Sequence, residues 1–343
     1  MALIKRLLPG GPLRDRLERW HAYWKWGYRR EYAHLDWPDD GSGRPRILLL
    51  ADRPGWAFDT QAQALKRHLS SRFDARIAYA TYRPNLNRIA FDLVCVLAAD
   101  EFYHTRFVLN RLKIIKELAH MPEDFQSRYG VANMAEAIDL LTADSATVFV
   151  ISKRFQKEVC PIRPCFLVNQ GIEPEIMRCM KERVGSLKLG WVGDSRAQHK
   201  GLHDILLPAA EPFELRIASG KLSTSELVEF YNSVDIVCIA SSVEGGPLPL
   251  LEGMSCGCFP VATDVGIVPE VIRHNENGLI VERNVEAFRA AFRWGAEHLD
   301  FVRAAGLRNS ESIPRNWSWA KTVASWETVF DHALSQLWAS AKR

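Results

Sequence analysis

The amino-acid sequence predicts an α/β fold in which parallel β-sheets are covered by helices on both faces. Short apolar runs typical of buried strands recur along the chain, and helical stretches lie between most of them. The runs form two series, one between residues 47 and 152 and one between residues 187 and 281. A chain of 343 residues is long enough for two domains.

The first series contains the strands that we expect in the N-terminal half. A helix is expected from Thr60 to Ser70, and Ser152 is a suitable N-cap for a helix over residues 153–159. The expected strands are Ile47–Ala51, Ala75–Ala80, Phe91–Leu97, Leu112–Leu118 and Thr147–Ser152.

The second series has the same alternation. Ser223-Thr-Ser-Glu226 has the pattern of a capping box, which predicts a helix that begins there and extends to Ser233. A long amphipathic helix is expected over Trp319–Leu337. The expected strands are Leu187–Val192, Phe213–Ala218, Val234–Ala240, Phe259–Ala262 and Leu279–Val281.

Residues 1–44 differ from the rest of the chain. Residues 1–35 hold eight Lys and Arg against three Asp and Glu, a local charge of about +5. An apolar stripe at helical spacing predicts an amphipathic helix, and its members are Leu13, Leu17, Trp20, Trp24 and Tyr28. Such a helix suits an anionic membrane surface, and equally suits packing on the protein body or on a second subunit. A linker is expected over residues 39–45.

Bulk composition excludes several classes of function. The net charge of +3 does not indicate a nucleic-acid partner. No apolar run approaches the roughly 20 residues of a membrane span, and no signal peptide is visible. The odd count of seven cysteines, with Cys95 and Cys238 in apolar runs, indicates free thiols and a cytoplasmic protein. Cys256-Gly-Cys258 lacks the spacing of a zinc or redox pair, so no metal site is expected.

Glu244 and Glu252 are the most informative pair of residues. They lie in Glu244-Gly-Gly-Pro-Leu-Pro-Leu-Leu-Glu252, which follows a strand-like run and then continues as a helix. The Glu244 carboxylate can contact the polar side of a ligand, and the Glu252 carboxylate can accept hydrogen bonds from a diol such as that of ribose. The helix N-terminus between them favours an anion. Sugar, phosphate and ribose together indicate a nucleotide sugar.

The stretch from Tyr231 to Val281 resembles the donor-binding core of the family 4 glycosyltransferases, which have the GT-B fold. The matching elements, in order, are Glu244-Gly-Gly-Pro, Glu252-Gly-Met-Ser-Cys-Gly, Pro260-Val-Ala-Thr, Val265-Gly266, Pro269-Glu270 and Asn277-Gly278-Leu-Ile-Val. The resemblance implies two doubly wound Rossmann-like domains that face a central cleft, placed here at residues 45–184 and 185–315. It also implies that residues 316–343 form a helix that crosses back to the first domain, while residues 1–44 form an N-terminal helical extension.

The resemblance assigns nucleotide-binding roles in the second half. Gly193 would allow a sharp bend near the diphosphate, and Lys200 would offset charge on the leaving group. Many members of the family have an arginine directly after the glycine, where this chain has Asp194, so Arg196 is a substitute candidate. A second group of residues would contact the ribose, sugar or phosphate: Glu252 the ribose hydroxyls, Glu244 the donor sugar, and the backbone of Gly245, Gly246 and Leu248 the sugar or phosphate.

The first half matches less closely. Its first loop has only Gly55 where many relatives have two or three glycines, which puts a phosphate contact there in doubt. A histidine at a strand end often faces the transferred sugar in this family. His120 is our choice, and His104 is its rival. Gln170 replaces the asparagine of an Asn-Gly turn that precedes the interdomain linker.

The resemblance implies a retaining, metal-independent glycosyltransferase that needs no cofactor. Its donor would be a nucleoside-diphosphate sugar carrying a hexose, and its acceptor a cell-surface glycan or lipid-linked saccharide. The catalytic residues would be Glu244, His120 and Lys200. The protein would be cytoplasmic, with residues 1–35 as a contact to the inner face of the plasma membrane. Two alternatives stay open: a non-catalytic GT-B protein that binds a nucleotide sugar or a partner, and a nucleotide-sugar epimerase.

Overall fold

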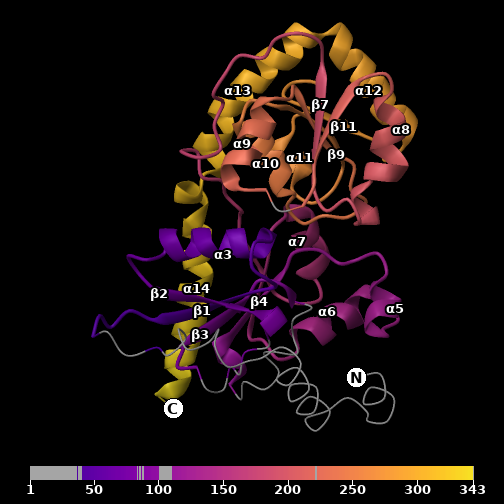
Figure 1. The fold of residues 1–343 in the computed structure, drawn as a ribbon. Coiled ribbons are helices and arrows are strands. Elements are labelled where there is room, and N and C mark those ends of the chain that lie inside the picture. Colours follow the sequence, from indigo (N-terminus) through magenta and orange to yellow (C-terminus); the bar gives the residue numbers. More distant parts are fainter. Residues whose placement is uncertain are drawn as a thin grey trace.

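The computed structural model describes residues 37, 41–82, 84, 86, 89–99, 110–220 and 222–342. They form two α/β units, one above the other in Figure 1, and a long C-terminal helix that runs along the lower unit. Each unit is built on a parallel sheet, of six strands in the first and five in the second. The predicted α/β fold with two doubly wound halves is confirmed. The predicted helix within residues 1–35, like His104, lies outside the described residues.

The first sheet has the strand order β2-β1-β3-β4-β5-β6, and all its pairings are parallel. The two-residue edge strand β6 has no run long enough to be seen in the sequence. The elements of this unit are β1 (Arg46–Ala51), α3 (Ala57–His68), β2 (Asp74–Tyr79), β3 (Leu93–Val96), β4 (Ile114–Leu118), α5 (Phe125–Tyr129), α6 (Met134–Thr142), β5 (Thr147–Val150), α7 (Lys153–Val159) and β6 (Phe166–Leu167), with short 3-10 turns at Ala80–Tyr82 and Arg111–Lys113.

The second sheet has the order β11-β10-β9-β7-β8, again entirely parallel. A short 3-10 turn, Gln198–Lys200, and a π-helical turn, Leu202–Leu206, follow its first strand. The other elements are β7 (Lys188–Val192), α8 (Leu207–Ala210), β8 (Glu214–Ala218), α9 (Thr224–Asn232), β9 (Ile236–Ile239), α10 (Leu248–Ser255), β10 (Phe259–Thr263), α11 (Val268–Val271), β11 (Leu279–Val281), α12 (Val285–Glu297) and α13 (Leu299–Trp317).

Local signals in the sequence set several element boundaries. The predicted capping box opens α9, because Ser223 Oγ accepts from Glu226 N and the Glu226 side chain accepts from Ser223 N. Ser152 caps α7 as predicted. β4 starts two residues later than expected, because the Asn110 side chain accepts from Leu112 N and holds residues 111–113 in a 3-10 turn.

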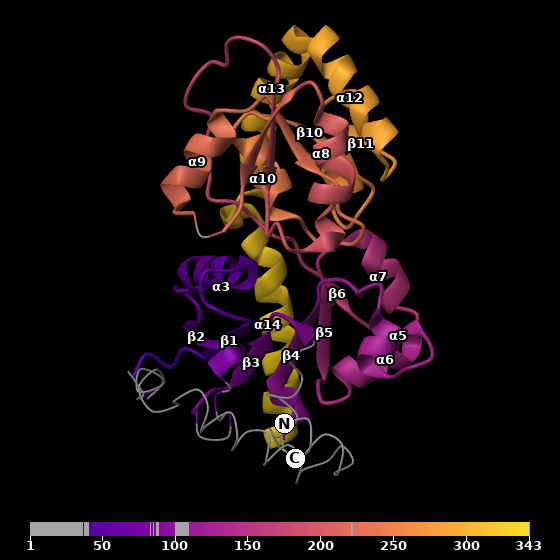
Figure 2. The same cartoon turned by 45° about the vertical axis from the view of Figure 1, so that its right-hand side comes forward.

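The last helix, α14 (Trp319–Ala341), belongs to the core of the first unit. Its inward face packs on α3 and on strands β1, β3 and β5. Trp326 is fully buried there and stacks edge-on against Phe149 at 5.0 Å between ring centroids. Figure 2 shows α14 passing from the second unit down across the first. Within the residues that the structure describes, the chain therefore crosses between the units twice.

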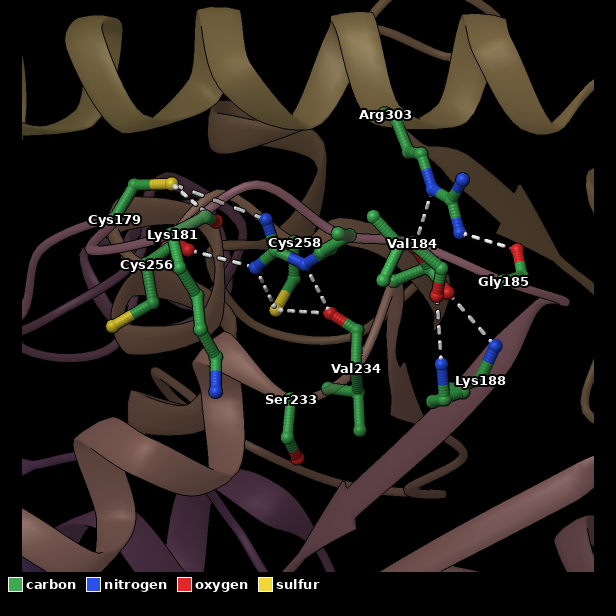
Figure 3. A network of polar contacts seen from close by, with 12 residues as sticks. Cys179, Lys181, Val184, Gly185, Lys188, Ser233, Val234, Cys256, Cys258 and Arg303 are labelled. Carbon is green, nitrogen blue, oxygen red and sulfur yellow. Dashed lines mark hydrogen bonds and ion pairs between the residues drawn. The ribbon is translucent and has the colours of Figure 1, made fainter.

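The first of these crossings, residues 172–187, is fixed to the second unit by Arg183. Its guanidinium donates to the carbonyls of Tyr231 at 3.1 Å and Cys256 at 2.8 Å. Figure 3 shows Cys179, Cys258 and Val234 around this network, with Arg303 bonded to Gly185 beside it. The ends of α9 and α10 are thereby held together.

Two other features bear on the sequence-based predictions. All seven cysteines are free, and Cys95 and Cys238 are buried as predicted. Among the described helices, none combines the length and apolar character that crossing a bilayer requires. The domain boundaries at residues 44, 184 and 315 stay predictions.

Candidate functional site

The candidate site lies at the carboxyl ends of strands β7 and β9. These neighbours flank the point where the strand order of the second sheet reverses, which is where open α/β sheets bind ligands. Gly193 directly follows β7, and Glu244 lies in the loop after β9. The fold alone therefore brings these two predicted residues to one place.

Lys200 and Glu244 form an ion pair at the centre of the site. Lys200 Nζ donates to Glu244 Oε1 at 2.6 Å, and Ser241 Oγ donates to the same oxygen at 2.9 Å. Their side chains are 24% and 15% exposed, so the pair is shielded but reachable by a ligand. The lysine predicted for the diphosphate is thus held by the carboxylate predicted for the sugar.

Two glycines position Lys200. Gly201 has a φ of +70°, and a Cβ there would lie 2.4 Å from the Ala240 carbonyl oxygen. A Cβ at Gly193 would lie 3.0 Å from Lys200 Cδ. Only glycine lets the turn after β7 approach the end of β9 this closely. The sequence-based reason for Gly193, room for a diphosphate, is thus joined by a packing reason.

Arg196 lies further out than Lys200. Its side chain is 84% exposed, and its guanidinium donates to both carboxylate oxygens of Asp194 at 2.9 and 3.0 Å. These hydrogen bonds lower the pKa of Asp194 to about 2. Arg196 therefore neutralises the acidic residue that stands where many relatives have an arginine, and its role toward a diphosphate stays a prediction.

Gly245 and Gly246 lie against the first unit. A Cβ on Gly245 would be 2.2 Å from the Ala119 carbonyl oxygen, and one on Gly246 would be 2.1 Å from Gln170 Oε1. The resemblance implied that the backbone of these glycines contacts the sugar or phosphate. The atoms nearest to them in the structure belong to the first unit. Leu248 follows as the first residue of α10.

Glu252 lies in the second turn of α10 and is 9% exposed. Its Oε2 accepts a hydrogen bond from the Tyr231 hydroxyl at 2.8 Å. Burial raises the pKa of Glu252, and the hydrogen bond from Tyr231 opposes that rise. Tyr231 lies in α9, so the sequence offered no sign of this partner.

His120 faces this group of residues from the first unit. It follows β4, and its neighbour Ala119 contacts Gly245 as described. Its ring is solvent-accessible yet crowded by protein atoms, and this desolvation lowers its pKa. The Glu244 carboxylate opposes that change, while His199 and Lys200 add to it. The structure thus brings His120 within electrostatic reach of both predicted catalytic partners.

Sequence reasoning missed His199 and Ser241. His199 precedes Lys200 and accepts a hydrogen bond from Ser242 N at 2.8 Å through its carbonyl oxygen. Burial lowers the pKa of its ring, as does the neighbouring Lys200. Its position beside the predicted lysine was the one available signal. Ser241 directly follows the strand that the sequence predicted over Val234–Ala240.

The glycine-poor first loop is occupied by its own carboxylate. Asp59, in the first turn of α3, accepts from Gly55 N at 2.7 Å and from the Tyr79 hydroxyl at 2.9 Å. An anion bound at this helix N-terminus would compete with Asp59. Within the part of the chain that the structure describes, His, Cys, Asp and Glu form no group of three suited to a metal.

Comparison with known proteins agrees with this geometry. Residues 217–297 match the family described as Glycosyl transferases group 1. The chain is 32% identical over 108 residues to D-inositol 3-phosphate glycosyltransferase from Pseudarthrobacter chlorophenolicus, covering 30% of this chain and 24% of that protein. It is 33% identical over 103 residues to N-acetyl-alpha-D-glucosaminyl L-malate synthase from Bacillus anthracis, covering 29% and 26%. These matches span about a quarter of each relative.

Solved structures resemble the chain over a greater length. Sucrose-phosphate synthase from Thermosynechococcus elongatus superposes with a TM-score of 0.71 at 12% identity, covering 87% of this chain and all of that one. Anabaena HepE in complex with UDP-glucose gives 0.66 at 11% identity, covering 84% of this chain and all of that one. At such identities the likeness shows the fold, which is that of the GT-B glycosyltransferases.

Proposed function

We propose that the protein transfers a hexose from a nucleoside-diphosphate sugar to a hydroxyl group of a saccharide or lipid-linked saccharide. The observation that carries the proposal is the Lys200–Glu244 ion pair at the strand ends of the second sheet, with His120 facing it from the first. The glycosyl transferase match over residues 217–297 supports it.

Each predicted residue has a use in binding the donor. Glu252 accepts hydrogen bonds from the ribose diol, and the N-terminus of α10 at Leu248 faces phosphate or sugar. Lys200 has three N–H donors, so its ammonium can bind a diphosphate oxygen while it keeps its bond to Glu244. Arg196 is exposed enough to turn from Asp194 toward the outer phosphate.

The chemical step follows from these charges. As the glycosidic bond breaks, negative charge grows on the diphosphate, and Lys200 stabilises it. The acceptor hydroxyl attacks the same face of the sugar, and its proton passes to the leaving phosphate, so the anomeric configuration is retained. His120, whose pKa is lowered, is neutral at pH 7 and hydrogen-bonds the sugar without opposing the positive charge that develops on its ring. Lys200 supplies the cation that a metal ion supplies in other transferases.

The names of similar proteins support a nucleotide-sugar donor and a hydroxyl-bearing acceptor as the substrate classes. Anabaena HepE was crystallised with UDP-glucose, and the two relatives are named D-inositol 3-phosphate glycosyltransferase and N-acetyl-alpha-D-glucosaminyl L-malate synthase. We extend to this chain only the general pattern of a nucleotide-sugar donor and a hydroxyl acceptor. A lipid-linked acceptor is proposed from the basic, aromatic stretch of residues 1–35.

Donor turnover tests the proposal directly. The protein is incubated with UDP-, GDP-, ADP- and dTDP-hexoses, with and without an extract of lipid-linked saccharides, and nucleoside diphosphate release is measured. Release that depends on acceptor, persists in EDTA and gives a product with the donor's anomeric configuration by NMR is expected. Binding of a nucleotide sugar without release would favour the non-catalytic alternative. Conversion of the nucleotide-bound hexose into its epimer would favour the epimerase.

A further inference from the structure

The buried pair of Tyr231 and Glu252 has a geometry that binding of a ribose alone does not explain. Tyr231 is fully buried in α9, and its hydroxyl group donates to Glu252 Oε2 at 2.8 Å. Among the described residues, the hydrogen bond to the Glu252 side chain goes to Oε2, so Oε1 can accept a hydrogen bond from a ligand. One carboxylate oxygen is therefore fixed by the protein, and the other is available to a ligand.

Burial opposes the charge that Glu252 needs. A carboxylate accepts hydrogen bonds from a diol with both oxygens, whereas a protonated carboxyl group has lost part of that capacity. Removal from water raises the pKa of Glu252, and the Tyr231 hydrogen bond lowers it. Burial also raises the pKa of Tyr231 well above its usual value, so the hydroxyl keeps its proton and stays a donor.

The other ionisable groups near Glu252 do not replace this donor. Cys256, at the end of α10, and Cys258, before β10, both have a raised pKa and are neutral thiols at pH 7. The Cys258 thiol points to the Tyr231 carbonyl oxygen at 3.2 Å rather than to the carboxylate. Among the described residues, the Tyr231 hydroxyl is thus the hydrogen-bond donor that reaches the Glu252 side chain.

Tyr231 is itself held in place. Its carbonyl oxygen accepts from Arg183 at 3.1 Å, and its ring packs edge-on against Phe230 at 5.8 Å between centroids. The capping box fixes the other end of the same helix. Tyr231 is therefore held at its backbone by Arg183 and at its ring by Phe230, which fixes the direction of its hydroxyl group.

We propose that Tyr231 is a positioning residue for donor binding, whose hydroxyl holds Glu252 ionised and turned toward the ribose diol. The proposal rests on the proposed function, in which Glu252 binds the ribose. In this proposal, the affinity for the nucleotide depends on the ionisation of the buried Glu252 carboxyl group. Affinity is full where Glu252 is charged, and is lost as the pH falls through its pKa. Removal of the hydroxyl moves that loss to higher pH.

The test compares Tyr231→Phe with the unaltered protein by calorimetry. Among UDP, GDP, ADP and dTDP, the tightest binder is titrated between pH 6 and pH 9. We expect the ratio of the two Kd values, variant over unaltered, to grow as the pH falls. The ratio should reach about tenfold for every unit by which the pKa of Glu252 in the variant exceeds that in the unaltered protein. Protonation of the ligand and of nearby histidines is common to both proteins and cancels in this ratio.

Two further variants make the result specific. Tyr79→Phe removes a matched tyrosine–carboxylate hydrogen bond, to Asp59 in the first unit, and should give a Kd ratio near one at every pH. In a Glu252→Gln background, the Tyr231→Phe change should have no pH-dependent effect, because glutamine does not ionise. Circular dichroism and thermal melting check that each variant is folded.

The outcomes separate the two proposals. If Glu252→Gln weakens binding by tenfold or more but the Tyr231→Phe ratio is the same at all pH values, the positioning role is wrong and the ribose assignment stands. If Glu252→Gln leaves the Kd unchanged, or none of the four nucleotides binds, the proposed donor site fails and the role of Tyr231 fails with it.

Discussion

The contact of Gly246 with Gln170 yields the sharpest structural prediction. A Cβ on Gly246 would lie 2.1 Å from Gln170 Oε1 and 2.9 Å from its Cδ, and 3.0 Å is the shortest separation that real Cβ atoms show. Gly246→Ala therefore requires a displacement of about 0.9 Å. Gln170 is 5% exposed and donates to Gln61 Oε1 at 3.2 Å, so its side chain has little room to withdraw.

We expect Gly246→Ala to destabilise the protein by about 1–3 kcal/mol, the usual cost of one extra methyl group in a packed site. If the loop after β9 moves instead, the donor-binding groups move with it. A misplacement of about 1 Å lowers the rate of a positioned reaction by roughly 10²-fold. Urea unfolding measures the first effect, and kcat/KM for nucleoside diphosphate release measures the second.

A double variant isolates the contact. Gln170→Ala removes the opposing side chain. In a Gln170→Ala background, Gly246→Ala should therefore cost much less stability and activity than it does in the unaltered protein. Gly245→Ala is the matched control, because its Cβ would meet the Ala119 backbone at 2.2 Å, which no side-chain truncation relieves. If Gly246→Ala has no effect, or Gln170→Ala does not rescue it, this reading of the interface between the units is wrong.

Three other predictions concern the chemistry and the N-terminus. Lys200→Ala should lower kcat by about 10²-fold or more and change the donor KM less, because charge on the diphosphate grows in the transition state; equal effects on both would limit Lys200 to ground-state binding. His120→Ala should depress transfer but leave nucleotide Kd nearly unchanged. The activity that depends on neutral His120 should be lost as the pH falls through the pKa of His120, which lies below the usual 6.5. If His104→Ala has these effects instead, the choice of His120 over His104 is wrong. Flotation with anionic vesicles should require residues 1–41 and should weaken in high salt. Each well-placed basic side chain should contribute about 1 kcal/mol of membrane-binding free energy. A protein beginning at Ser42 that floats equally well would contradict this prediction.

The fold could be predicted from the sequence because its determinants are local. Alternating apolar runs gave both sheets, and caps such as Ser152 and Ser223 marked helix starts to the residue. The loop motifs at Gly193 and Glu244 follow neighbouring strands, so a parallel sheet places them together without further information.

The pairings within the site could not be predicted, because they join residues far apart in the chain. Lys200 and Glu244 are 44 residues apart, and Tyr231 and Glu252 are 21 apart. No periodicity reports which of several polar side chains meet. The buried Lys116 is a similar case: it lies in an apolar strand and is neutralised by Asp144 at 2.6 Å, from the loop before the next strand.

The two chain crossings between the units meet at one point. Ile172 N donates to the Trp317 carbonyl at 2.8 Å, and Trp319 N donates to the Ile172 carbonyl at 3.0 Å. A Cβ at Gly171 would lie 2.7 Å from Trp319 N, so the crossings are in close contact.

Two segments joined in this way act as a single pivot. We therefore expect any movement of one unit against the other to be a rotation about this joint at Ile172. Displacement grows with distance from that axis, so α7 moves further than the joint when the units turn. Arg154, in α7, bonds to Asp264 of the second unit at 2.5 Å, and Lys153 N donates to Glu270 at 2.7 Å. These bonds join the two units at a distance from the pivot. They must break before the units can rotate apart on that side.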